Sequence, residues 1–146
     1  MGRTAETRAA LDRVARYAGG LARPHQPEHH YRYDPGKALS YTATALAWAG
    51  DPAAEGYART AIRELETAAE HRPRRLASAR LDLALALVAA GKPDEAQAQA
   101  LAAVVSGRVV ASNWWRAGEV LAGIERSGIR EAAELRDACE TYRPRT

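Results

Sequence analysis

Residues 80–107 read RLDLALALVAAGKPDEAQAQALAAVVSG and predict two helices joined by a tight Gly-Lys-Pro turn. Apart from Arg80 and Asp82, the first of these helices has almost no polar face, because leucine or valine stands at positions 81, 83, 85, 87 and 88. A helix that is apolar nearly all round is covered on several sides. We therefore expect it to be the central helix, with the alanine-rich second helix packed closely against it at positions 96, 100 and 103.

The composition of the 146-residue chain favours helices throughout. Alanine, which has the highest intrinsic helix propensity, occurs 34 times, and phenylalanine is absent. The length is about that of one domain. We therefore predict an all-α fold in which residues 1–146 form a single helical-repeat domain.

Prolines, glycines and capping residues divide the chain into about seven helices. A polar loop with three prolines, at residues 23–35, separates the first helix from the rest. Glycines at 50, 91 and 128 each mark the turn of a helical hairpin. The hairpins are predicted as three antiparallel pairs, at about 36–70, 75–106 and 113–142. The individual helices are expected at about 5–22, 36–49, 52–70, 75–90, 93–106, 113–127 and 129–142.

The three hairpin glycines are 41 and 37 residues apart, a spacing typical of helical solenoids. The segment 114–121, WWRAGEVL, resembles the first half of the tetratricopeptide pattern, whereas the uneven period and Ala100 depart from that pattern. In each first helix a small residue is expected where the partner helix crosses at close range, namely Ala43, Ala84 or Gly118. The predicted fold is therefore a tetratricopeptide-like stack of helix pairs.

Three longer stretches extend this resemblance: HHYRYDPGKALSYTATALAWAGDPAAEGYAR at 29–59, RPRRLASARLDLALALVAAGKPDEA at 72–96 and SGRVVASNWWRAGEVLAGI at 106–124. Together they resemble the carboxy-terminal helical-repeat region of actinobacterial helix-turn-helix transcriptional regulators of the Xre type. In that family an amino-terminal DNA-binding domain is joined to a repeat domain that senses a ligand or dimerises. Nothing in this chain resembles the DNA-binding part. The resemblance therefore implies the regulatory half of a longer protein.

The pair Trp114-Trp115 is the most informative candidate binding feature. Adjacent helical residues point about 100° apart, so the two rings cannot be buried in the same way. Trp114 is expected in the core. Trp115 is expected to face the surface that the first helices of the stacked pairs form together, on which Tyr41, Thr44 and Glu119 also lie. An exposed tryptophan in a groove is typical of an anchor for a peptide or a small apolar ligand. The alternative is that Trp115 packs under the preceding link or in a dimer seam.

The loop 23–35 contains the second set of candidate residues. His25, His29 and His30 with Asp34 would be the ligands of a metal site, but they lie among prolines with no cysteine nearby, so we expect a structural loop and no bound metal. His30 and Arg32 are expected to point outward and to border a ligand site.

Three smaller features also carry expectations. We interpret the basic segment 72–75, RPRR, as a solvated turn with arginine near a helix C-terminus, and the alternative is a phosphate or nucleic-acid contact. Ser112 or Asn113 is expected to cap the helix that follows. Cys139 is expected to be a buried, inert thiol on the apolar face of the last helix.

Several classes of function find no support in the sequence. It has no glycine-rich phosphate loop, no nucleophile elbow and no carboxylate pair on an apolar face, so we expect no catalytic residues and no cofactor. The 21 basic and 18 acidic residues are too evenly mixed to imply direct nucleic-acid binding. No apolar run approaches the roughly 20 residues of a membrane span. One cysteine fits a reducing cytoplasm.

The sequence therefore predicts a non-enzymatic interaction module. Its partner would be a peptide, another protein or a second copy of the chain in a homodimer, and its role would be in transcriptional regulation. The alternative is a small-molecule sensor that holds its ligand between the loop 23–35 and the groove near Trp115.

Overall fold

The computed structural model describes residues 5–10, 35–68, 71–130 and 132–145, and these residues are all-α with no strand among them. Residues 5–10 are helical. The other elements are α2 (Pro35–Trp48), α3 (Ala53–Thr67), α4 (Pro73–Ala89), α5 (Pro93–Val105), the 3-10 turn η1 (Ala111–Asn113), α6 (Trp114–Ser127) and α7 (Ala132–Tyr142). None of the described helices has the length and apolar character needed to cross a bilayer.

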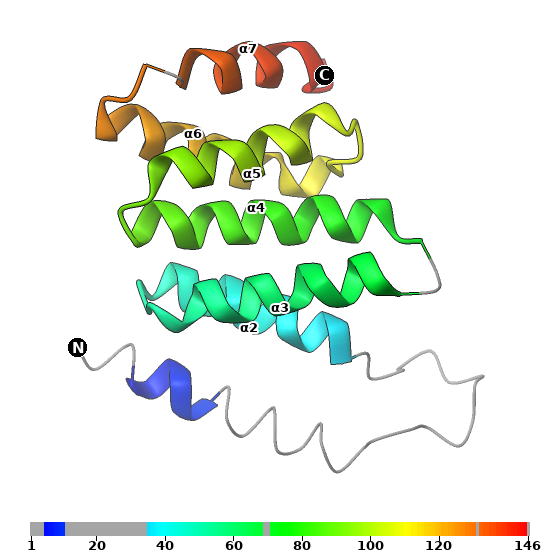
Figure 1. The fold of residues 1–146 in the computed structure, drawn as a ribbon, viewed down its shortest axis with the longest axis vertical. Helices are drawn as coiled ribbons and strands as arrows, with labels where there is room; N and C mark the ends of the chain where they lie inside the picture. The colour runs from blue at the N-terminus through cyan, green and yellow to red at the C-terminus, as the bar shows by residue number, and fades with distance from the viewer. Residues whose placement is uncertain (1–4, 11–34, 69–70, 131, 146) are drawn as a thin grey trace.

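Consecutive helices fold back on one another and form a stack of antiparallel pairs (Figure 1). The pairs are α2 with α3, α4 with α5, and α6 with α7. Helix α4 lies in the middle of the stack and contacts α2, α3, α5 and α6. The predicted all-α stack of helix pairs is thus confirmed, and so is the central place of the helix in residues 80–107.

The core is centred on α4 because its apolar surface is covered on all sides. Leu81, Leu83 and Leu87 are at most 1% exposed, and Leu85 and Val88 are half-buried against the same cluster. The small positions of α5 are fully buried as expected: Ala96, Ala100 and Ala103. Alanine side chains at these positions let the α4 and α5 backbones approach closely.

The first hairpin turn combines a glycine with a buried capping carboxylate. Gly50 has φ of +70°, a left-handed conformation that glycine adopts without steric cost. Asp51, 3% exposed, then accepts a hydrogen bond at 2.9 Å from the backbone N–H of Ala53, the first residue of α3. Arg8 forms a salt bridge with the same carboxylate and holds the pKa of Asp51 below its ordinary value. This contact fastens the helical segment 5–10 to the α2–α3 turn.

Several helix boundaries differ from the prediction. Helix α4 begins at Pro73 rather than 75. Proline is favoured at the first helical position because its missing N–H would have no acceptor within the helix there. Helix α3 ends at Thr67 rather than 70, and α7 begins at Ala132 rather than 129. Residues 11–22 of the predicted first helix and nearly all of the loop 23–35 lie outside the described residues.

The small residues predicted at the helix crossings are buried in α2 and α4 but not in α6. Ala43 and Ala84 are fully buried. Gly118 is instead exposed, and a Cβ atom built on it would meet nothing within 4 Å. A Cβ atom on Gly123 would lie 2.5 Å from Cγ1 of Val88, so the backbone of α6 lies close to α4 there. The expectation for Gly118 is therefore wrong, and the glycine of α6 that a neighbouring helix approaches closely is Gly123.

These two glycines make a matched pair for mutagenesis. Gly123→Ala should destabilise the protein by about 1–3 kcal/mol, because the added methyl group overpacks the contact with the β-branched Val88. Gly118→Ala should leave stability unchanged or raise it by up to about 1 kcal/mol, because alanine favours the exposed helix. Urea denaturation of both variants measures the difference, and equal effects would show that the crossing does not lie at Gly123.

Candidate functional site

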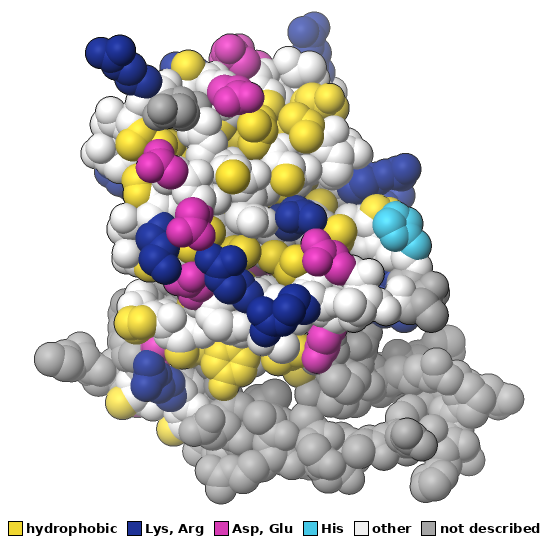
Figure 2. Space-filling model, in the orientation of Figure 1, with side chains coloured by type: hydrophobic (Ala, Val, Ile, Leu, Met, Phe, Trp, Pro, Cys, Tyr) yellow, Lys and Arg dark blue, Asp and Glu magenta, His cyan; other side chains and the backbone are white. Residues whose placement is uncertain are grey.

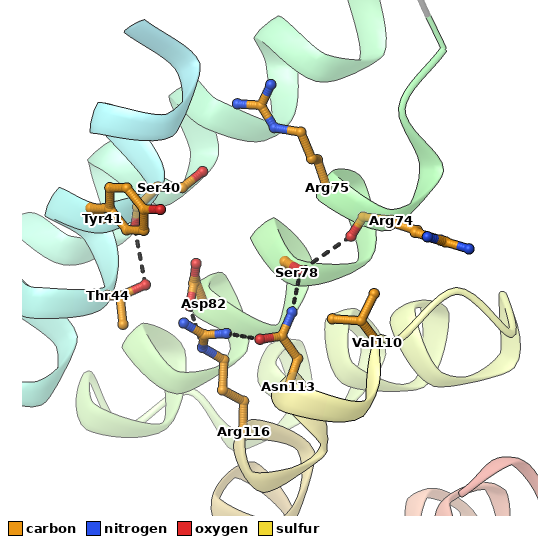
Figure 3. A pocket seen from close by; sticks show the side chains of 10 residues that line it. All are labelled: Ser40, Tyr41, Thr44, Arg74, Arg75, Ser78, Asp82, Val110, Asn113 and Arg116. Carbon is orange, nitrogen blue, oxygen red and sulfur yellow. Dashed lines mark hydrogen bonds and ion pairs between the residues drawn. The ribbon is translucent and has the colours of Figure 1, made fainter. Parts of the chain in front are cut away.

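A pocket of about 310 Å3 opens between α2, α4 and the start of α6 (Figure 3). Nine of the ten residues that line it carry a hydroxyl, amide or charged group. The side chains that line it are Ser40, Tyr41 and Thr44 from α2, Arg74, Arg75, Ser78 and Asp82 from α4, Val110 from the link before η1, Asn113 from η1 and Arg116 from α6. The pocket thus lies on the surface shared by the first helices, where the sequence placed the binding site.

A buried ion pair joins α4 and α6 at this pocket. Asp82 is only 2% exposed, although it stands in an otherwise apolar helix. Its Oδ1 atom lies 3.1 Å from Nε of Arg116, whose side chain is 16% exposed. Neither of these two atoms has a hydrogen-bond partner among the described residues, so the contact is an ion pair without hydrogen-bond alignment.

Burial raises the pKa of Asp82 to about 6 because removal from water disfavours the charged carboxylate. The positive charge of Arg116 and the hydroxyl of Thr44 oppose this effect. The folded-state pKa therefore lies above the ordinary value of 3.8, so protonation of Asp82 favours the folded state.

A chain of hydrogen bonds holds Arg116 in place. Its Nη1 donates to Oδ1 of Asn113, whose Nδ2 donates to the hydroxyl of Ser78. Ser78 in turn donates to the backbone carbonyl of Arg74 at 3.1 Å. The guanidinium carbon of Arg116 also lies 4.9 Å from the ring centre of Trp115. Arg116 is therefore held by Asp82 of α4, by Asn113 of η1 and by Trp115 of its own helix.

Trp115 is half of an exposed aromatic pair beside this pocket. Trp114 is 7% exposed and lies in the core, whereas Trp115 is 41% exposed, as predicted. The ring of Trp115 stacks on Trp48 from the end of α2, with ring centres 5.3 Å apart and planes at 28°. Trp48 is itself 61% exposed. The sequence analysis did not predict this partner.

The structure brings together some of the predicted site residues and not others. Tyr41 and Thr44 line the pocket, and Trp115 adjoins it through Arg116. Glu119 is exposed on α6 one turn after Trp115 and does not line the pocket. His30 and Arg32 lie outside the described residues, as do the other candidate metal ligands. Within the described part of the chain, no group of three or more potential metal-ligating side chains comes together.

Two interpretations of the sequence need correction. Arg74 and Arg75 occupy the first turn of α4, not a helix C-terminus, so they lie at the end of the helix dipole that disfavours cations. Figure 3 shows Arg74 directed away from Asp82. Asn113 makes no capping hydrogen bond at the start of α6, because its side chain bonds to Ser78 and Arg116.

Cys139 is half-buried on α7, and burial raises the pKa of its thiol. This agrees with its expected place on the apolar face, although it is less completely covered than the sequence suggested.

The opposite face of the stack has a different character. Figure 2 shows basic and acidic side chains lying together in a band across the face formed by α3, α4 and α5. Arg59 lies 2.9 Å from both Glu55 and Glu95, and Lys92 lies 3.1 Å from Glu55. These charges neutralise one another across neighbouring helix pairs. The exposed aromatic pair and the arginine-lined pocket therefore distinguish the surface formed by α2, α4 and α6, the first helices of the three pairs, which we call the first-helix surface.

A scan against protein-family models, a search of curated proteins and a search of solved structures each returned no match to this chain.

The raised pKa of Asp82 predicts a specific dependence of stability on pH. The contribution of Asp82 to the free energy of unfolding should fall by on the order of 2 kcal/mol as the pH rises from about 4.5 to about 7.5. Asp82→Asn cannot titrate and lacks this contribution. Urea denaturation of both proteins at the two pH values isolates it, because the titrations of all other groups cancel in the difference. A wild-type-minus-variant difference that is the same at both pH values would contradict the assignment.

Proposed function

We propose that this chain is a non-enzymatic interaction module that binds a peptide or a partner protein on the surface of α2, α4 and α6. The observation that carries the proposal is the stacked pair Trp48–Trp115, which remains exposed beside a pocket lined by polar groups. Large aromatic side chains with polar donors nearby are typical of the residues that dominate binding energy at protein interfaces.

The two faces of the stack support this choice of surface. On α3 and α5 the charged side chains are paired with one another, and exposed pairs of this kind contribute little binding energy. On the first-helix surface, the aromatic rings of Tyr41 and Trp48 are more than half exposed. A partner that covers these rings would therefore bury apolar area on this surface.

The resemblance to actinobacterial Xre-type regulators supports a regulatory role for such binding. In that setting the module would act in the cytoplasm as the sensing or dimerising half of a transcriptional regulator. Its bound partner would be a peptide, a protein or a second copy of the chain, and DNA contacts would be made elsewhere.

A small-molecule sensor is the second candidate, and the size of the pocket favours it. A volume of about 310 Å3 lies at the lower end of the range of small-molecule sites. The pocket lies beside Trp115, where the sequence analysis placed the ligand, and polar groups from three helices converge on it.

Selection from a random peptide library displayed on phage tests the interaction module. Peptides that bind the wild-type chain should bind Trp115→Ala at least about tenfold more weakly, because the anchor ring is lost. Tyr57→Ala is the matched control, since Tyr57 is 39% exposed but lies on α3, away from the pocket. Far-UV circular dichroism should be unchanged in both variants.

The outcomes separate the alternatives. Enriched peptides that bind both variants equally well would rule out the first-helix surface as the binding site, and a failure to enrich any peptide would contradict peptide binding. A wild-type dimer in sedimentation velocity that Trp115→Ala converts to a monomer would identify the partner as a second copy of the chain.

A further inference from the structure

Arg116 is held on several sides but keeps hydrogen-bonding capacity to spare. Its Nε lies 3.1 Å from Asp82, its Nη1 donates to Asn113, and its guanidinium group lies over the ring of Trp115. Among the described residues, no acceptor receives a hydrogen bond from its Nη2. A guanidinium group fixed in this way has already lost its conformational freedom, so a ligand that binds it does not bear that entropy cost.

The arrangement of charged side chains around the pocket favours an anionic ligand. Three arginines and one aspartate line it. Asp82 is almost completely buried, whereas Arg74 is exposed and Arg75 is half-exposed. The carboxylate of Asp82 is therefore the charged group of the pocket that is least available to a ligand.

We propose that this pocket binds the oxyanion of a ligand, a carboxylate or a phosphate, with Arg116 as the residue that contacts it. Guanidinium groups bind both of these anions with charge-assisted hydrogen bonds. The Trp48–Trp115 pair lies next to Arg116 and would bind an apolar or aromatic part of the same ligand. The inference rests on the proposed function of this surface in binding, and it names the chemical class that is bound.

Asp82 has two opposing effects on such binding. Its carboxylate helps to position Arg116 from α4, but it also neutralises part of the charge that an anion would meet. Asparagine at this position has nearly the same shape and removes the competing charge. Asp82→Asn should therefore strengthen anion binding, which is the opposite of what a residue that contacts the ligand directly would show.

Three small aromatic probes test the proposal by isothermal titration calorimetry on the full chain. They are phenylacetate, phenyl phosphate and the neutral analogue phenylacetamide. At least one of the two anions should bind about tenfold or more tightly than the amide, because only an anion gains from Arg116. The tighter of the two anions shows whether the pocket is suited to a carboxylate or to a phosphate.

The variants assign the effect to Arg116. Replacing Arg116 alone would leave the buried carboxylate of Asp82 without its counterion and endanger folding. The double variant Arg116→Gln with Asp82→Asn removes both charges together and should lose the preference for the anion. Asp82→Asn alone should bind the anion several-fold more tightly. Arg126→Gln is the control, since Arg126 is exposed in the last turn of α6 and does not line the pocket.

Circular dichroism establishes that each variant is folded. If the double variant is unfolded, Arg116→Lys replaces it, because lysine keeps the counterion of Asp82 but lacks the planar guanidinium group. That variant should bind the anion several-fold more weakly than wild type.

The proposal is overturned if neither anion binds at concentrations up to about 10 mM. It is equally overturned if phenylacetamide binds as tightly as the anions, or if Arg126→Gln weakens binding as much as the double variant does. Peptides that depend on Trp115 could still be selected in any of these cases, so the proposed function would stand without the anion site.

Discussion

The fold depends on the burial of α4, which packs against α2, α3, α5 and α6. Its leucines point in almost every direction around the helix axis, so no single partner could bury them. Helices α2 and α3 cover it from one side of the stack, and α5 and α6 cover it from the other. Once α2 and α6 both pack on α4, their side chains meet over it. The pocket and the aromatic pair are therefore consequences of the way the core is completed.

The ion pair Asp82–Arg116 places two charged groups in the otherwise apolar contact between α4 and α6. A buried carboxylate loses hydration, and a single charged partner without hydrogen-bond alignment offsets that loss only in part. A leucine at position 82 would fit the pattern of the helix better. The pair links α4 and α6 at the pocket, so its effect lies in the placement of Arg116 more than in stability.

The sequence was sufficient to predict the helices, the hairpin turns and the burial of Trp114, because these depend on local features. A left-handed turn such as that at Gly50 needs glycine, and adjacent helical residues point in different directions whatever surrounds them. The surface that carries the site was also predictable, through Tyr41 and Thr44. Asp82 could have been recognised from the same pattern, since a helix covered all round leaves no solvated position for it.

Other features depend on how the helices are placed relative to one another, and the sequence pattern does not specify this. The motif aligned Gly118 with a helix crossing, but the rotation of α6 puts Ala117 in the core and Gly123 at the close approach. Asn113 has the chemistry of a helix cap, yet a tertiary hydrogen bond to Ser78 takes its side chain instead. Trp48 and Trp115 come from different helix pairs, and their rings meet because α2 and α6 both pack on α4.

That last contact depends directly on how α2 and α6 are placed relative to one another. Helices α2 and α6 flank α4, and the indole rings meet across it. Any change in the placement of α2 relative to α6 changes the distance between the two rings. Stacked indoles couple their electronic transitions, so near-ultraviolet circular dichroism should report such a movement without an added label. A ligand that moves α2 relative to α6 would therefore change the near-ultraviolet circular dichroism of the protein.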